Sequence, residues 1–210
     1  MKIYLLIIIN LFSYMLSFAQ EVNTSICRTT VYPQFVPAII TLENGQIIQK
    51  SEANIFMVNG ALLYKRGRIN MQAEMKNIKQ VDFEDHRYIK VDTILAYIVD
   101  TLNNNKLLCA TMIDLDTYKS EVMNNRLITN LELGSYVNVS TTDLSETNEY
   151  PIVSYYYYEI NGKIIKAHER AIIKYIPRNK RREFDDLLEN DDFSWNSDIW
   201  LMRILKLMTR

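Results

Sequence analysis

Residues 38–113 are a succession of short β-prone runs separated by turn residues, and this pattern limits the fold more than any other feature of the chain. Asn44-Gly45 and Asn59-Gly60 each separate two such runs. Asn-Gly in this setting favours a type I′ hairpin, because both central positions of that turn need a positive φ. Residues 69–76 alternate between apolar and polar side chains, which is typical of a half-buried strand. Further β-prone runs lie at residues 78–83, 87–91, 94–99 and 107–113. We therefore predict an antiparallel meander over residues 38–113.

The pattern changes towards the C-terminus. Residues 115–122 favour a short helix and 136–141 a strand, and Asn161-Gly162 then predicts a firm hairpin within residues 152–167. Three helical stretches follow, beginning at residue 169 and marked later by Phe184, Leu187 and Leu188 and by Ile199, Met202, Leu205 and Met208. The predicted class is α+β: an antiparallel β-meander or small barrel, followed by a β-hairpin and a C-terminal helical cap. We expect one unit over residues 38–210, β-rich at 38–113 and with the hairpin and helices at 150–210.

The first 19 residues have the features of a secretory signal peptide. Lys2 precedes an almost continuous apolar run, and Ser17 and Ala19 place small residues at −3 and −1 of a cleavage point before Gln20. An uncleaved anchor is the alternative, although the run is shorter than the ~20 residues of a spanning helix. We expect residues 1–19 to be removed, residues 20–37 to form an extended lead-in, and the mature chain to be periplasmic or extracellular and not membrane-spanning.

Charge and composition exclude some partners. Removal of Lys2 leaves 23 basic residues against 25 acidic ones, a net charge of −2. A nearly neutral chain with mixed signs gives no reason to expect nucleic acid as a partner. No sequence motif calls for a cofactor.

Four consecutive tyrosines form the clearest candidate binding site. Tyr155, Tyr156, Tyr157 and Tyr158 fall on a predicted strand, so two rings lie on each face. One face could offer an aromatic platform for a protein or a glycan. In the alternative interpretation, one pair packs beneath the C-terminal helices and the other covers the sheet with its hydroxyls in water.

Two weaker candidate catalytic sites each contain a histidine. Asp82, Glu84 and His86 alternate and would share one face of a strand, where they could hold a divalent metal or act as an acid–base pair. The alternative is a polar corner between two strands. His168 precedes Glu169 where the last hairpin meets a helix, and it is either a proton-transfer group or a helix-start residue.

The two cysteines, Cys27 and Cys109, could form a disulfide after export. Cys109 lies within an apolar strand run, so a buried free thiol is the alternative. Neither cysteine has the spacing of a metal ligand to any other residue.

Several short motifs resemble those of uncharacterised secreted proteins of the Bacteroidota. They are the Phe18-Ala19-Gln20 ending of the leader, the Ile-x-Leu-x-x-Gly turn ending at Gly45, the Lys-x-Ile-x-x-Val-x-Phe strand from Lys76 to Phe83, and the Tyr-rich hairpin leading to a Pro-Lys/Arg-rich helix. The resemblance implies export and carries no functional residue with it.

The sequence favours a non-enzymatic binding or interaction module of the envelope or extracellular space, whose partner is a protein or a glycan. The alternatives are a metal-assisted hydrolase, built on the Asp82 group or His168, and a structural subunit of a surface assembly.

Overall fold

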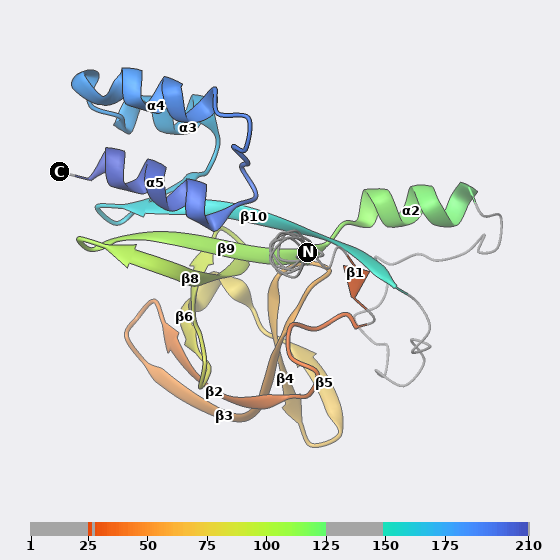
Figure 1. Cartoon of the computed structure of the whole chain (residues 1–210). Coiled ribbons are helices and arrows are strands. Elements are labelled where there is room, and N and C mark those ends of the chain that lie inside the picture. The colour runs from red at the N-terminus through yellow and green to blue at the C-terminus, as the bar shows by residue number, and fades with distance from the viewer. Residues whose placement is uncertain (1–24, 27, 125–148, 210) are drawn as a thin grey trace, which may run out of the picture.

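The computed structural model describes residues 25–26, 28–124 and 149–209 (Figure 1). Eleven strands in these residues form an antiparallel sheet: β1 (Ser25–Ile26), β2 (Val36–Leu42), β3 (Ile47–Phe56), β4 (Ala61–Arg66), β5 (Ile69–Gln72), β6 (Ile78–Asp82), β7 (Arg87–Val91), β8 (Ile94–Leu102), β9 (Asn105–Ile113), β10 (Tyr150–Ile160) and β11 (Lys163–Lys166). The helices are α2 (Leu115–Asn124), α3 (Glu169–Ile172), α4 (Arg181–Leu188) and α5 (Asp198–Met208). Short 3₁₀ turns are η1 (Met75–Asn77), η3 (Ile173–Tyr175) and η4 (Arg178–Lys180).

The sheet is large and open. Its strand order is β1-β10-β9-β8-β7-β6-β2-β3-β4-β5, and β11 extends it beside β10. The sheet curls until the β3–β4 turn meets β8, where Leu95 N donates to Gly60 O at 2.9 Å. The antiparallel sheet with C-terminal helices confirms the α+β prediction, whereas β5 remains an edge and the described strands do not close into a barrel.

The turn types differ from the sequence prediction in two of three Asn-Gly hairpins. Asn161 and Gly162 both have positive φ, 50° and 77°, as a type I′ turn requires. In the β2–β3 and β3–β4 turns only the glycines do, with φ of 83° at Gly45 and 68° at Gly60, so the type I′ prediction is wrong there. Both connections are longer than two residues, and such loops place a single left-handed residue at their end.

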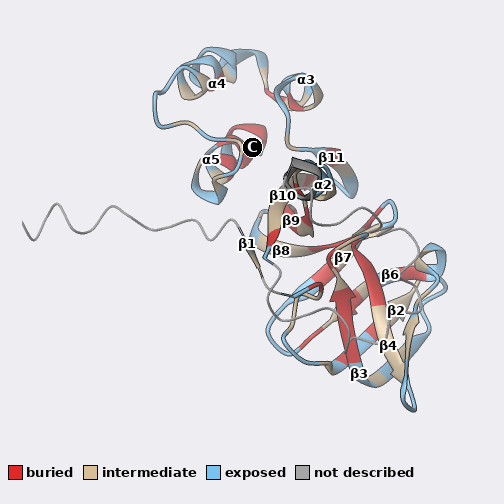
Figure 2. Ribbon diagram, turned by 90° about the vertical axis from the view of Figure 1, so that its right-hand side faces the viewer, coloured by how far each residue is buried: buried red, intermediate tan, exposed pale blue. Residues whose placement is uncertain are grey.

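One face of the sheet, here called the inner face, carries a row of register partners across seven strands. The row comprises Ile48, Ile40, Val81, Tyr88, Tyr97, Cys109 and Tyr156, on β3, β2, β6, β7, β8, β9 and β10 in turn. Ile40, Val81, Tyr88 and Cys109 are buried and Tyr97 is partly buried, and Figure 2 shows burial concentrated along the strand centres and on α5. The alternation read from the sequence therefore places this face in the core.

The C-terminal helices cover one end of the inner face. Leu107 and Tyr158 of the sheet pack against Phe184 of α4 and Leu201 of α5 in one apolar cluster. The apolar face predicted for the last helix is correct at its C-terminal end, where Leu205 and Met208 are buried, and wrong at its start, where Ile199 is 64% exposed and Leu201 is fully buried. No helix among the described residues is both long and apolar enough to cross a bilayer.

The lead-in and the first helix have identifiable anchors. The fully buried Asn54 accepts a hydrogen bond from Tyr32 N at 3.0 Å and donates to the carbonyls of Tyr32 and Gln34 at 2.9 and 3.0 Å. Asp114 begins α2, where the sequence places a helix, and accepts from Thr117 N at 3.1 Å. The predicted signal peptide and the predicted strand 136–141 lie outside the described residues.

Candidate functional site

The four consecutive tyrosines divide between the two faces of β10. Tyr156 and Tyr158 lie on the inner face, and Tyr158 is fully buried, with its hydroxyl donating to Leu201 O at 3.0 Å. Tyr155 and Tyr157 lie on the opposite face and are half-exposed. Lys166 Nζ lies 5.5 Å from the ring centroid of Tyr155. Burial thus prevents a ligand from reaching Tyr158, whereas Tyr156 on the inner face and Tyr155 and Tyr157 on the opposite face remain partly exposed.

A second aromatic group lies in the α4–α5 loop and at the start of α5, and the sequence interpretation missed it. Phe193 is its centre, with its ring centroid 5.1 Å from that of Trp195 and 5.9 Å from that of Trp200. All three rings are half-exposed. The guanidinium of Arg203 lies 4.3 Å from the centroid of the Trp200 ring, and Ile199, which precedes Trp200 on α5, is exposed. We call Phe193, Trp195, Ile199, Trp200 and Arg203 the tryptophan surface.

The loop that carries the tryptophan surface is held by its own short-range hydrogen bonds. Phe193 N donates to Asn190 O at 2.9 Å, and Asn196 N donates to Ser194 Oγ at 3.1 Å. The loop is also tied to the sheet, where the Tyr156 hydroxyl donates to Asn196 O at 3.4 Å. The aromatic side chains are therefore presented on an ordered scaffold, which reduces the entropy that binding would cost. The signal available in the sequence was that both tryptophans of the chain fall within six residues of each other.

Exposed carboxylates flank the tryptophan surface. They lie on and after α4 and at the start of α5: Asp185, Asp186, Glu189, Asp191, Asp192 and Asp198. In the described part of the chain none of these six forms an ion pair. The two helices also carry exposed basic side chains, those of Arg181, Arg182, Arg203 and Lys206, so the surroundings are mixed in charge, and Asp191, Asp192 and Asp198 are the carboxylates next to the aromatic residues in the sequence.

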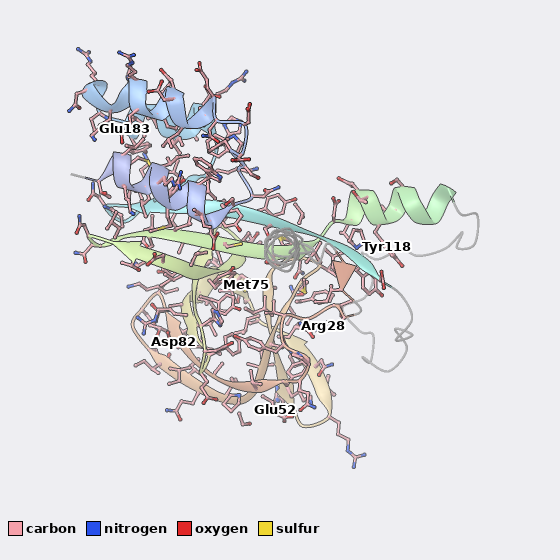
Figure 3. All side chains as sticks on the ribbon, viewed as in Figure 1. Arg28, Glu52, Met75, Asp82, Tyr118 and Glu183 are labelled. Carbon is pink, nitrogen blue, oxygen red and sulfur yellow. The ribbon has the colours of Figure 1, made fainter. Side chains whose placement is uncertain are left out.

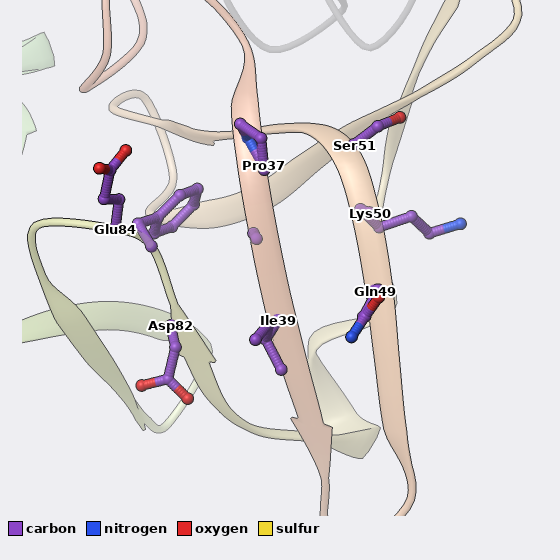
Figure 4. A pocket seen from close by; sticks show the side chains of 9 residues that line it. Pro37, Ile39, Gln49, Lys50, Ser51, Asp82 and Glu84 are labelled. Carbon is purple, nitrogen blue, oxygen red and sulfur yellow. The ribbon is translucent and has the colours of Figure 1, made fainter.

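An open pocket of about 730 Å³ lies on the sheet at the point where Pro37 interrupts the β2–β3 ladder. Pro37 has no N–H to donate, and it faces two β3 residues, Ser51 and Glu52, in a bulge. Residues 37–39, 49–51 and 82–84 line the pocket (Figure 4). The pocket thus contains Asp82 and Glu84, two of the three residues that the sequence grouped as a candidate metal site.

The three candidate ligands do not converge. Asp82 accepts hydrogen bonds from Arg87 Nε and, at 2.7 Å, from Gln80 Nε2. Glu84 is exposed, and His86 instead pairs with Asp85, Nδ1 to Oδ2, at 2.8 Å. Among the described residues, no three His, Cys, Asp or Glu side chains form a group that could hold a metal ion. The described residues therefore do not form the metal centre that the metal-assisted hydrolase hypothesis requires.

A hydrogen bond to Asp85 connects the β6–β7 turn with the lead-in. The Tyr32 hydroxyl donates to Asp85 Oδ1 at 2.7 Å. Although slight burial acts in the opposite direction, the hydrogen bonds from Tyr32 and His86 lower the pKa of Asp85 below its ordinary value. Burial, reinforced by the hydrogen bonds with Tyr88 and Asp85, raises the pKa of Tyr32 above its usual range. This arrangement keeps Asp85 ionised as an acceptor, which is a structural role.

The surroundings of His168 and Cys109, the remaining candidate residues, are those of residues with a structural role. His168 is the N-cap of α3, and its Nδ1 accepts from Arg170 N at 3.1 Å, as the helix-start interpretation expects. Cys109 is buried on the inner face, where burial raises the pKa of its thiol. Cys27 lies outside the described residues, so the Cys27–Cys109 disulfide stays a prediction.

The chain matches no protein-family model, no curated protein and no solved structure at a significant level of similarity. The resemblance to secreted proteins of the Bacteroidota therefore stays an expectation, and function has to be argued from the surfaces described above.

Proposed function

We propose that this chain is an exported, non-enzymatic binding module whose tryptophan surface holds a protein partner in the periplasm or outside the cell. The features of a signal peptide in residues 1–19 support export. The observation that carries the proposal is the grouping of both tryptophans of the chain with Phe193, Ile199 and Arg203 on one ordered, solvent-facing loop and helix start. Tryptophan and arginine are the residues most enriched at the energetic centres of protein interfaces.

The geometry favours a protein over a glycan. A sugar needs an open ring face on which to stack, but Arg203 already covers one face of Trp200. Ile199 is 64% exposed and adds aliphatic surface. An apolar protein side chain can bury this surface, whereas the hydroxyl groups of a sugar gain nothing by contacting it. The carboxylates next to the aromatic residues favour a partner that has an apolar centre with lysine or arginine beside it.

Two surface variants on one helix test this assignment. Arg203→Glu reverses a charge that stacks on Trp200, whereas Lys206→Glu makes the same charge change one turn further along α5 at an exposed position. The tagged proteins are expressed in the source organism, cross-linked, captured and compared by quantitative mass spectrometry. We expect a partner that is recovered with wild type and Lys206→Glu and at least about tenfold depleted with Arg203→Glu, which corresponds to 1.4 kcal/mol.

Two results would contradict the proposal. Recovery of every partner equally with Arg203→Glu and Lys206→Glu would remove the tryptophan surface as the binding surface, and so would the absence of any partner above background. Fractionation of the same cells tests export separately. We expect a mature N-terminus at Gln20 outside the cytoplasm, and a cytoplasmic protein that retains Met1 would overturn the export proposal.

A further inference from the structure

The strand β5 is a short edge strand of four residues that carries no charge, proline or bulge against strand pairing. It ends the strand order, and no described strand pairs with its other side. Natural edge strands commonly carry lysine, proline or a bulge that prevents another chain from adding to the sheet. The sequence of β5 is Ile-Asn-Met-Gln, which contains no charge and no proline, and its pairing with β4 has no register shift.

One hydrogen bond beyond the end of β5 shows which of its backbone groups are free. Ala73 N donates to Leu62 O at 2.8 Å, so residues 62 and 73 are a hydrogen-bonded pair of the β4–β5 ladder. Such pairs alternate along an antiparallel ladder with pairs whose N–H and C=O groups point outward. Two residues further along, Tyr64 and Met71 are therefore bonded to each other. Asn70 and Gln72 then direct their N–H and C=O groups away from β4, towards the open edge.

We propose that this edge pairs with β5 of a second copy of the chain, antiparallel across a two-fold axis that passes between the two Met71 residues. In this register Asn70 of one copy lies opposite Gln72 of the other, and the outward groups exchange four backbone hydrogen bonds. The contact is isologous, because each copy contributes the same strand. The two open sheets then continue into one another.

Charge complementarity favours a second copy over another extended peptide, and antiparallel over parallel pairing. Arg68 precedes β5 and Glu74 follows it, and both are exposed with no ion pair or hydrogen bond in the described residues. The proposed register places Arg68 of one copy opposite Glu74 of the other, twice. A parallel copy would instead place like charges near each other. A strand with a positive group at its start and a negative group at its end is complementary to itself when reversed.

The exposed apolar surface of β5 also favours pairing with a second copy. Ile69 is 65% exposed at the start of β5, on the same face as Met71 and Ala73. In the proposed register Ile69 lies opposite Ala73 of the second copy, so pairing covers apolar surface that the single chain leaves in water. The strands are short, and we therefore expect a weak dimer with dissociation constants in the micromolar range or above.

A charge swap tests the register. Sedimentation velocity is measured on the mature chain from about 1 µM to about 1 mM, where the wild type is expected to shift from monomer to dimer. Arg68→Glu or Glu74→Arg alone places like charges opposite each other and should weaken dimerisation at least about tenfold. The double variant Arg68→Glu/Glu74→Arg restores both pairs and should return the dissociation constant to within about threefold of wild type. Lys79→Glu, at an exposed position of β6, is the matched charge-change control.

A cross-link tests the two-fold axis without relying on charge. In a Cys27→Ser background, Met71→Cys would place two cysteines at a pair without backbone bonds, whose Cα atoms are about 4.5 Å apart, within the range of a disulfide. Mild oxidation should then give a reducible dimer, whereas Gln72→Cys, which lies opposite Asn70, should not. A chain that stays monomeric to about 1 mM, or a dimer that neither the single charge variants nor Met71→Cys affects, would overturn the proposal.

Discussion

Tyr97 of β8 and Cys109 of β9 are register partners on the inner face of the sheet, where Cys109 is buried. Tyr156 of β10 is the register partner of Cys109 on its other side. Cys109 thus lies between two tyrosines on neighbouring strands. Its surroundings are those of a packed core residue and not of a reactive cysteine.

The Cys109 thiol should therefore react slowly in the folded protein. Burial raises its pKa, and each unit by which a thiol pKa rises lowers the thiolate fraction about tenfold. In a Cys27→Ser variant, where Cys109 is the one remaining thiol, we expect reaction with an aromatic disulfide reagent at pH 8 to be at least about tenfold slower than after unfolding in urea. Equal rates in the two states would show that the thiol is accessible.

The hydroxyl of Tyr158 should contribute to stability, whereas that of Tyr157 should not. Tyr158→Phe leaves the carbonyl of Leu201 without its buried donor, and we expect a loss of about 1 kcal/mol in the free energy of unfolding. Tyr157 is half-exposed on the opposite face, and its hydroxyl has no hydrogen-bond partner in the described residues. Tyr157→Phe should cost less than about 0.5 kcal/mol. Urea denaturation of both variants makes the comparison, and equal losses would contradict the assignment of the two faces.

Gly60 and Gly45 both have positive φ but differ in the space around them. An added Cβ at Gly60 would lie 2.6 Å from Ile94 Cβ, whereas at Gly45 it would meet nothing within 4 Å. We expect Gly45→Ala to cost about 1 kcal/mol from backbone strain alone. Gly60→Ala should cost about 3 kcal/mol, because overpacking against β8 adds to that strain. Thermal or urea unfolding measures the difference, and similar losses would show that the β3–β4 turn does not close onto β8.

The parts of the fold that the sequence predicted are those decided by local chemistry. The alternation at residues 69–76 locates β5, although the strand ends at Gln72 and residues 75–77 form the 3₁₀ turn η1. Asn161-Gly162 predicts the β10–β11 turn because both residues tolerate the left-handed conformation. Periodicity did not decide which face of α5 is buried. The sequence predicts a stripe of Ile199, Met202, Leu205 and Met208, but packing against the sheet buries Leu201 and Ile204 together with Leu205 and Met208 and leaves Ile199 exposed.

The candidate surfaces were less accessible to sequence reasoning, because they depend on contacts between separate elements. Phe193, Trp195 and Trp200 meet only when the α4–α5 loop turns back on itself, and no periodic pattern encodes that. The four tyrosines are obvious in sequence, but β10 directs Tyr158 into the core and leaves its neighbour Tyr157 half-exposed. Figure 3 likewise shows Asp82 in the sheet and Glu183 on α4 at separate ends of the molecule, although both belong to conspicuous charged stretches of the sequence.

Asp85 gives the protein a pH dependence whose sign follows from its surroundings. Its folded-state pKa lies below the ordinary value of 3.8, so its contribution to stability is present above that value and is lost as the pH falls through the folded-state pKa. The side chain is half-exposed, and solvent screening limits the contribution to less than about 1 kcal/mol. We expect Asp85→Asn to lower the free energy of unfolding at pH 6, and we expect the difference from wild type to vanish once the pH has fallen below the folded-state pKa of Asp85. Glu84→Gln, at the adjacent exposed position, is the matched control variant. A difference for Asp85→Asn that persisted at the lowest pH would mean that the carboxylate charge is not what Tyr32 and His86 stabilise.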